Sequence, residues 1–145
     1  SQIYEQQGNR EAQLEQLAIL LNNQQHDYAS AMLLAKAAIE AGDVNGANYY
    51  IDRALQIDPY RIDVHQLKAN YADLIGDPTL AVTEYEVLAK LDITDPVEAQ
   101  TNLAQAYLNN DQLEEAKRNV LTALEIAPSY QRAQQILLES VDRAN

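Results

Sequence analysis

The sequence contains no cysteine, tryptophan or phenylalanine, and only four glycines and four prolines among its 145 residues. Without cysteine there is no disulfide framework, no thiol nucleophile and no thiolate metal site, and this absence fits a reducing or an oxidising compartment equally well. Glycine and proline are too scarce for a fibrous or low-complexity chain, while Ala, Leu, Gln and Glu, which favour helices, are abundant. The composition therefore predicts an all-α protein.

Basic residues and long apolar runs are also scarce. Ten Lys and Arg stand against 22 Asp and Glu, which gives a net charge of −12 that repels phosphate backbones and anionic bilayers. No run approaches the ~18 apolar residues of a membrane span, and residues 1–5 lack the basic and apolar parts of a signal peptide. We expect no nucleic-acid ligand and no membrane insertion. The compartment stays open between the cytoplasm and, for a bacterial protein, the periplasm.

The sequence repeats itself with a period of 34 residues, which points to a repeat architecture. One aligned position holds Gly8, Gly42, Gly76 and, after one inserted residue, Asp111. A second position holds Gln13 and then small residues, namely Ala47, Ala81 and Ala116. A third position holds larger side chains, namely Leu17, Ile51, Tyr85 and Val120. Two of the repeats close with proline, at Pro59 and Pro128.

Apolar residues within each repeat follow helical spacing, as in the series Ala116, Val120, Ala123 and Leu124. Asp77, Asp95 and Asp111 are candidate N-caps, whereas Gly42 and Gly76 suit the left-handed residue that ends a helix. The alignment predicts a turn between paired helices at Gly8 as well. We predict helices over residues 9–23, 27–41, 44–57, 60–75, 78–91, 96–109, 112–126 and 130–143. Tyr49, Tyr85 and Tyr107 fall in or beside packing positions, so we expect all three in the core.

This pattern resembles the tetratricopeptide repeat, a helix–turn–helix unit of 34 residues. The repeat with Leu103, Ala104 and Tyr107 before its turn matches best, and the one with Lys68 and Ile93 departs most. The large aromatic residue that the family places early in the first helix is replaced by Ala31, His65 and Gln100. The resemblance implies an α-solenoid, in which helix pairs stack into a right-handed superhelix whose concave face is built from the first helices.

The phase of the repeat predicts one domain over residues 1–145. It comprises the second half of a truncated repeat (1–25), three full repeats (26–59, 60–94 and 95–128) and a capping helix (129–145). Because Tyr4 and Gly8 align with the end of a first helix and its turn, we expect the parent protein to continue upstream.

A search for catalytic and metal-binding motifs finds none. The two histidines, His26 and His65, have no second ligand at metal-site spacing, and we expect His65 to be a packing or rim residue. Asp92, Asp95 and Glu98 lack the spacing and the central glycine of a calcium loop, so capping is the stronger interpretation. We predict no catalytic residue, no metal, no cofactor and no enzyme activity.

The resemblance implies a binding groove along the first helices, lined near the start of each helix and every three or four residues after it. Here these residues are Met32, Lys36, Asp63, Gln66, Asn70, Asp73, Glu98, Thr101, Asn102 and Gln105. This set is amide-rich and mildly acidic, and amides both donate to and accept from a peptide backbone. The alternative for each residue is a merely solvated position.

Family members that bind the acidic C-termini of cytosolic heat-shock chaperones carry a clamp of Lys, Asn, Asn, Lys and Arg. The matching positions here hold Met32, Lys36, Leu67, Glu98 and Asn102, so the clamp is absent. We therefore expect a partner segment that is neutral or basic rather than acidic.

Three functions are compatible with these features. We favour a non-catalytic scaffold that binds a segment of a partner protein in the groove. The second is a C-terminal accessory domain of a larger enzyme, because residues 57–59 and 121–130 resemble the repeat domains of some bacterial proteins with metallopeptidase-like domains. The third is self-association through the truncated N-terminal face.

Overall fold

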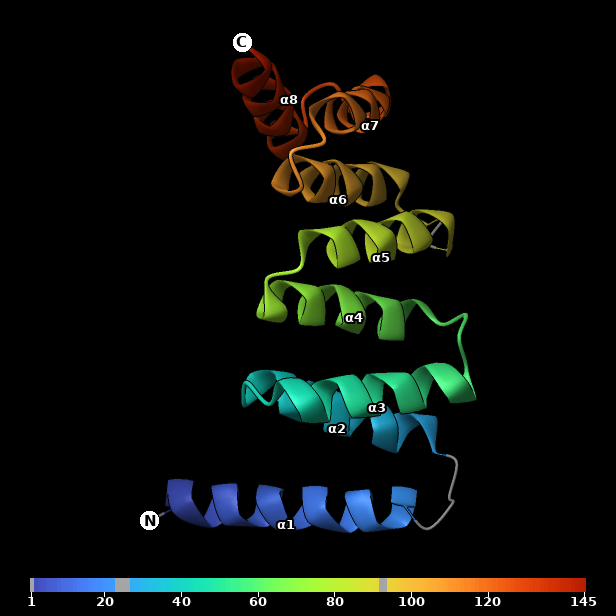
Figure 1. Ribbon diagram of the computed structural model, residues 1–145, viewed down its shortest axis with the longest axis vertical. Helices are drawn as coiled ribbons and strands as arrows, with labels where there is room; N and C mark the ends of the chain where they lie inside the picture. The colour runs from blue at the N-terminus through green and yellow to red at the C-terminus, as the bar shows by residue number, and fades with distance from the viewer. Residues whose placement is uncertain (1, 23–26, 92–93) are drawn as a thin grey trace. The chain divides into compact units, whose positions relative to one another are not determined.

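The computed structural model describes residues 2–22, 27–91 and 94–145 (Figure 1). His26, Asp92 and Ile93 lie outside these ranges. In the described part all regular structure is helical, in the elements α1 (Gln2–Asn22), α2 (Tyr28–Glu40), α3 (Val44–Ile57), α4 (Ile62–Ile75), α5 (Pro78–Leu91), α6 (Pro96–Asn109), α7 (Leu113–Ile126) and α8 (Gln131–Ala144). The predicted all-α fold is confirmed. The chain divides into two compact units, Ser1–Tyr60 and Arg61–Asn145.

From α2 onward, the helices begin and end within two residues of the predicted bounds, because local signals fix their ends. The carboxylates of Asp43, Asp77 and Asp95 each accept a hydrogen bond of 3.0 Å from a backbone N–H in the first turn of the helix that follows. Gly42 and Gly76 adopt the left-handed conformation, with φ of 70° and 67°.

Asp111 differs from the expected N-cap. Its φ is 57°, so it takes the left-handed conformation that glycine takes in the other turns, and α7 begins two residues later with no side-chain capping bond. Aspartate tolerates this conformation better than most residues because its short polar side chain bonds locally.

The turn predicted at Gly8 is wrong, because α1 is a continuous helix from Gln2 to Asn22. A glycine inside a helix costs only about 1 kcal/mol relative to alanine, and residues 2–12 are otherwise rich in helix formers. A Cβ atom at Gly8 would meet no atom within 4 Å beyond its chain neighbours and the adjacent backbone of its own helix, so an alanine would fit there.

In the unit Ser1–Tyr60, α2 packs against both α1 and α3. The buried contacts join α2 to α3 through small residues, which include Ala31, Ala35, Ala47 and Ala54. Helix α1 is mostly exposed and adds only partly buried side chains, among them Leu14 and Leu17. An ion pair of 2.6 Å between Arg10 and Glu40 also connects α1 with α2.

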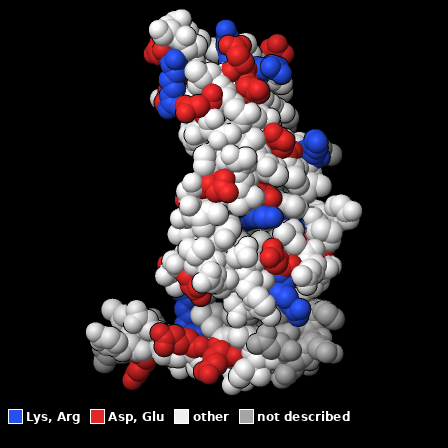
Figure 2. Space-filling model, in the orientation of Figure 1, with Lys and Arg blue, Asp and Glu red and all other residues white. Residues whose placement is uncertain are grey.

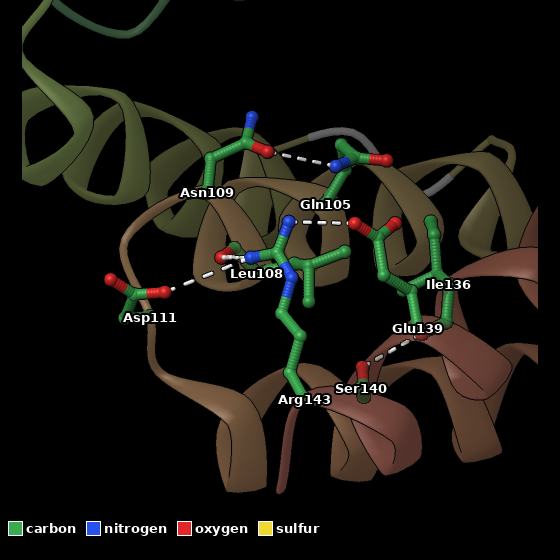
Figure 3. Close-up of polar contacts among 8 residues, drawn as sticks. All are labelled: Gln105, Leu108, Asn109, Asp111, Ile136, Glu139, Ser140 and Arg143. Atoms are coloured by element: carbon green, nitrogen blue, oxygen red, sulfur yellow. Dashed lines mark hydrogen bonds and ion pairs between the residues drawn. The ribbon is translucent and has the colours of Figure 1, made fainter.

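In the unit Arg61–Asn145, successive helices pack against each other and α8 also contacts α6. The apolar cluster shared by α6, α7 and α8 contains Ala104, Leu108, Ala116, Val120, Ala123, Ala133 and Ile136. Arg143 connects the end of α8 with Leu108 of this cluster and with Asp111 in the turn between α6 and α7 (Figure 3). Small residues dominate the cluster because they let the helix backbones approach closely.

A buried carboxylate joins α4 to α5. Glu84 is buried, and its two oxygens lie 2.8 Å from Nδ1 of His65 and 3.5 Å from Nζ of Lys68. None of the described helices is both long and apolar enough to cross a membrane.

Candidate functional site

One face of α4 and α6 carries the polar residues predicted for the groove. Asp63, Gln66, Asn70 and Asp73 are exposed on α4 and follow one another at helical spacings of three and four residues. On α6, Glu98 is exposed, and Asn102 and Gln105 are partly buried. The amide of Gln105 donates to Asn109 on the same helix over 2.9 Å (Figure 3).

Between these two helices lies a hollow of about 110 Å³, which we call the α4–α6 hollow. Its lining residues are Gln66, Tyr85, Leu88, Glu98, Ala99 and Asn102. Gln66 comes from α4, Tyr85 and Leu88 from α5, and the others from α6. The volume suits one small side chain or a few water molecules, since water occupies about 30 Å³ per molecule in the liquid.

Tyr85 supplies a hydroxyl group to the α4–α6 hollow. Burial raises the pKa of Tyr85 above its usual value of 10.0, and the carboxylate of Asp73 raises it further. A hydrogen bond with Gln66 and the charge of Arg132 act in the opposite direction on this pKa. The phenol therefore stays protonated at neutral pH, where it can donate to and accept from a ligand.

Arg132 reaches the same face from α8. Its Nη1 donates a hydrogen bond of 2.6 Å to Oδ1 of Asn102. This bond orients the amide of Asn102 so that its NH₂ group is left to donate elsewhere. No local sequence signal connects Arg132 with Asn102, because the two residues lie 30 positions apart.

Two predicted groove residues are placed wrongly. Met32 and Thr101 are both buried, so neither can line an open groove. The hydroxyl of Thr101 donates to the carbonyl of Val97 over 2.6 Å, which satisfies this polar group inside its own helix. Lys36 is exposed on α2, in the other unit from the α4–α6 hollow.

The expectation of three core tyrosines also needs correction, because Tyr49 is 48% exposed and the side chains of Tyr85 and Tyr107 are only partly buried. A sequence signal for Tyr85 exists in hindsight. At the repeat position of Tyr85 the other repeats have Leu17, Ile51 and Val120, and only tyrosine carries a polar tip that must find a partner.

Charges of both signs surround the site. Figure 2 shows acidic side chains gathered over α1, whereas red and blue side chains alternate over the helices α4 to α8. Around the α4–α6 hollow itself the carboxylates are Glu98 and Asp73, and the nearby cation is Arg132. In the described residues, no group of three His, Cys, Asp or Glu side chains is arranged to hold a metal ion.

Comparison with known proteins identifies the repeat. The tetratricopeptide repeat family matches residues 97–130, which overlap the predicted repeat at 95–128. No curated protein sequence matches the chain.

Solved structures resemble the chain at low sequence identity. MamA from Desulfovibrio magneticus RS-1, residues 41 to the end, shows a TM-score of 0.75 and 22% identity over 99% of this chain and 81% of its own. The Yersinia enterocolitica type III secretion chaperone SycD, in complex with a peptide of the translocator YopD, shows a TM-score of 0.65 and 18% identity. This match covers 81% of this chain and 94% of SycD. The first repeat domain of Spaghetti (RPAP3), bound to the HSP90 peptide SRMEEVD, shows a TM-score of 0.64 and 19% identity. This match covers 81% of this chain and 95% of the Spaghetti domain. These likenesses confirm the fold.

Proposed function

The chain has the tetratricopeptide-repeat fold and carries a repeat of that family at residues 97–130, and on this premise we propose that it is a non-catalytic interaction scaffold. Its unit Arg61–Asn145 binds an extended segment of a partner protein along α4 and α6. The observation that carries the proposal is the α4–α6 hollow, where Gln66, Tyr85 and Asn102 bring hydrogen-bonding groups around a small space. SycD and the Spaghetti domain, which share the fold, are each bound to a peptide.

The chemistry of the hollow suits a peptide backbone. An extended segment offers N–H and C=O groups in alternation, and amide and phenol side chains can form hydrogen bonds with both kinds of group. Leu88 contributes an apolar surface to the same hollow. Its volume of about 110 Å³ suits a small side chain better than a bulky aromatic one.

The charges favour a neutral or basic segment. Asp63, Asp73 and Glu98 are exposed along this face, whereas Arg132 is occupied with the amide of Asn102. An acidic segment would bring its carboxylates beside these three, and like charges disfavour such binding. The clamp that holds acidic chaperone termini in other members of the family is absent from the matching positions of this sequence.

A peptide-display library provides the test. We expect enriched peptides to carry a small residue between neutral or basic neighbours. Their affinity, measured by fluorescence polarisation, should fall at least ~10-fold in the double variant Gln66→Ala, Asn102→Ala, a loss of about 1.4 kcal/mol. Because Gln66 is exposed and Asn102 only partly buried, the melting temperature should change little.

The matched control removes two exposed amides from α3, with Asn48→Ala and Gln56→Ala, and should leave the affinity unchanged. Enriched peptides that bind both double variants equally would place the contact elsewhere on the protein. A screen that enriches no peptide would contradict the proposal as a whole.

A further inference from the structure

An open groove runs between α1 and α2. It is lined by Asn9, Ala12, Gln13, Gln16, Leu17 and Leu33, is widely open to solvent and has a volume of about 710 Å³. We call it the α1–α2 groove. Leu33 is 52% exposed there, although it stands in the middle of α2 beside residues that are buried. An apolar side chain left open in this way, within so large a groove, indicates a missing packing partner.

The other end of the same chain shows what that partner is. In the repeat alignment Gln13 and Leu17 of α1 correspond to Ala116 and Val120 of α7, and Leu33 of α2 corresponds to Ile136 of α8. Ile136 is only 2% exposed, and it belongs with Ala116 and Val120 to the cluster that α6 completes with Ala104 and Leu108. The α1–α2 groove is therefore the place that a first helix, the counterpart of α6, fills elsewhere in this protein.

Helix α8 has the features of such a first helix. Its residues Leu137, Leu138 and Val141 occupy the repeat positions of Leu103, Ala104 and Tyr107 on α6. Ala133, Ile136 and Ser140 are buried on α8. Leu138, in contrast, is 64% exposed, and Val141 is exposed as well. On α6 this face packs against α7, the second helix of the same repeat, whereas on α8 the equivalent face is exposed.

We propose that α8 of one copy of this chain docks in the α1–α2 groove of a second copy. The α8 helix of the first copy and the α1 helix of the second then form one helix pair, as α6 and α7 do within the chain. Helix α8 would lie between α7 and the incoming α1, just as α6 contacts both α5 and α7. The contact joins two different surfaces, so it adds copies head to tail and does not close into a symmetric dimer.

Charge complementarity supports this occupant despite the net charge of −12. Leu108 and Leu113 belong to the apolar contacts of α6 with α7, and their repeat positions hold Asp142 on α8 and Arg10 on α1. The two substitutions replace an apolar pair with an acid and a base, so Arg10, which Glu40 of its own copy contacts over 2.6 Å, would be shared with Asp142 across the contact. Gln134 on α8 and Asn9, Gln13 and Gln16 on α1 add uncharged amides.

The experiment measures the molar mass of the chain by light scattering as the protein concentration rises from micromolar to near-millimolar. The average mass should increase steadily above 16.2 kDa without a plateau at twice that value. Higher ionic strength should favour assembly, because salt screens the repulsion between chains that each carry −12.

Two single variants make the test specific. Leu138→Glu removes the docking face of α8, and Leu33→Glu removes the groove, so each variant alone should remain a monomer at every concentration. An equimolar mixture should give a dimer and nothing larger, because one intact α8 and one intact groove remain. Leu121→Glu, at an exposed apolar position on α7, is the control and should assemble like the parent chain.

Several results would overturn the proposal. They are a parent chain that stays monomeric throughout, a mixture of the two variants that does not dimerise, or assembly of either variant alone. A groove that instead receives another protein's helix or a preceding segment would give the first of these results. If Leu33→Glu loses its helical circular dichroism, Leu33→Ser takes its place. Peptide affinity at the α4–α6 hollow should be the same in Leu138→Glu, which separates this proposal from the proposed function.

Discussion

Arg143 of α8 donates a hydrogen bond from Nη1 to the backbone carbonyl of Leu108, 3.0 Å away near the end of α6 (Figure 3). The last carbonyl groups of a helix lack intrahelical partners, and a cation is favourable beside them. The same guanidinium lies 2.6 Å from Glu139 and 3.7 Å from Asp111. The Arg143 side chain thus connects the end of α8 with the turn between α6 and α7.

We expect Arg143→Ala to lower the free energy of unfolding by about 1 kcal/mol, because the main loss is one charge-assisted hydrogen bond at a partly exposed site. The free energy of unfolding of Arg143→Lys should lie between those of the parent chain and Arg143→Ala, since lysine keeps the charge but lacks the planar guanidinium. Urea denaturation measures both changes. Arg118→Ala, at an exposed arginine of α7, should cost less, and an equal cost would mean that the contact with Leu108 does not stabilise the fold.

The buried carboxylate of Glu84 leads to a larger expected effect. Glu84→Ala should cost about 2 kcal/mol, because it removes the buried carboxylate that His65 and Lys68 contact and opens a small cavity. Thermal and urea unfolding measure the loss. Glu125→Ala, at an exposed carboxylate of α7, is the control and should stay within about 0.5 kcal/mol of the parent. A Glu84 variant as stable as this control would show that the pairing contributes nothing.

Tyr107 gives a prediction about alkaline pH. Its hydroxyl donates to Oε1 of Glu86 over 2.8 Å, and burial together with this bond raises the pKa of Tyr107 to about 12. A group whose pKa is raised on folding stabilises the folded state below its unfolded pKa, here 10.0, and loses this contribution as the pH rises towards 12.

We therefore expect Tyr107 to be among the last tyrosines to ionise in an ultraviolet titration of the folded protein. Tyr107→Phe should remove that late step, cost less than about 1 kcal/mol at neutral pH and flatten the loss of stability above pH 10. Glu86→Gln, which keeps a hydrogen-bond acceptor but removes the charge, should move the ionisation of Tyr107 to lower pH. A late step that persists in Tyr107→Phe belongs to another tyrosine and would refute the assignment.

The continuity of α1 can be tested at its glycine. Gly8→Ala should stabilise α1 by about 0.5–1 kcal/mol, since alanine in an open helical position costs less conformational entropy than glycine. Gly76→Ala should destabilise by about 1–2 kcal/mol, because φ at Gly76 is 67° and a Cβ atom is strained there. Circular dichroism and thermal unfolding compare the two. Destabilisation by both substitutions would indicate a turn at Gly8, as the repeat phase had predicted.

The sequence by itself determined the helices and their order. Helix formation and capping are local, so the spacing of residues such as Ala116, Val120 and Ala123, together with Asp77 and Asp95 at helix starts, was sufficient to predict α2 to α8 within two residues. The 34-residue period then indicated the repeat family, and the match at residues 97–130 agrees with it.

Only the tertiary structure decided which side chains face open space. Met32 and Thr101 follow the same helical spacing as the exposed groove residues yet are buried, and α1 continues through Gly8, where the repeat phase predicts a turn. The pairing of Arg132 with Asn102, and the opening of Tyr85 into the α4–α6 hollow, depend on where separate helices lie. Local spacing fixes the face of a helix, whereas burial and long-range contacts depend on the helices packed against that face.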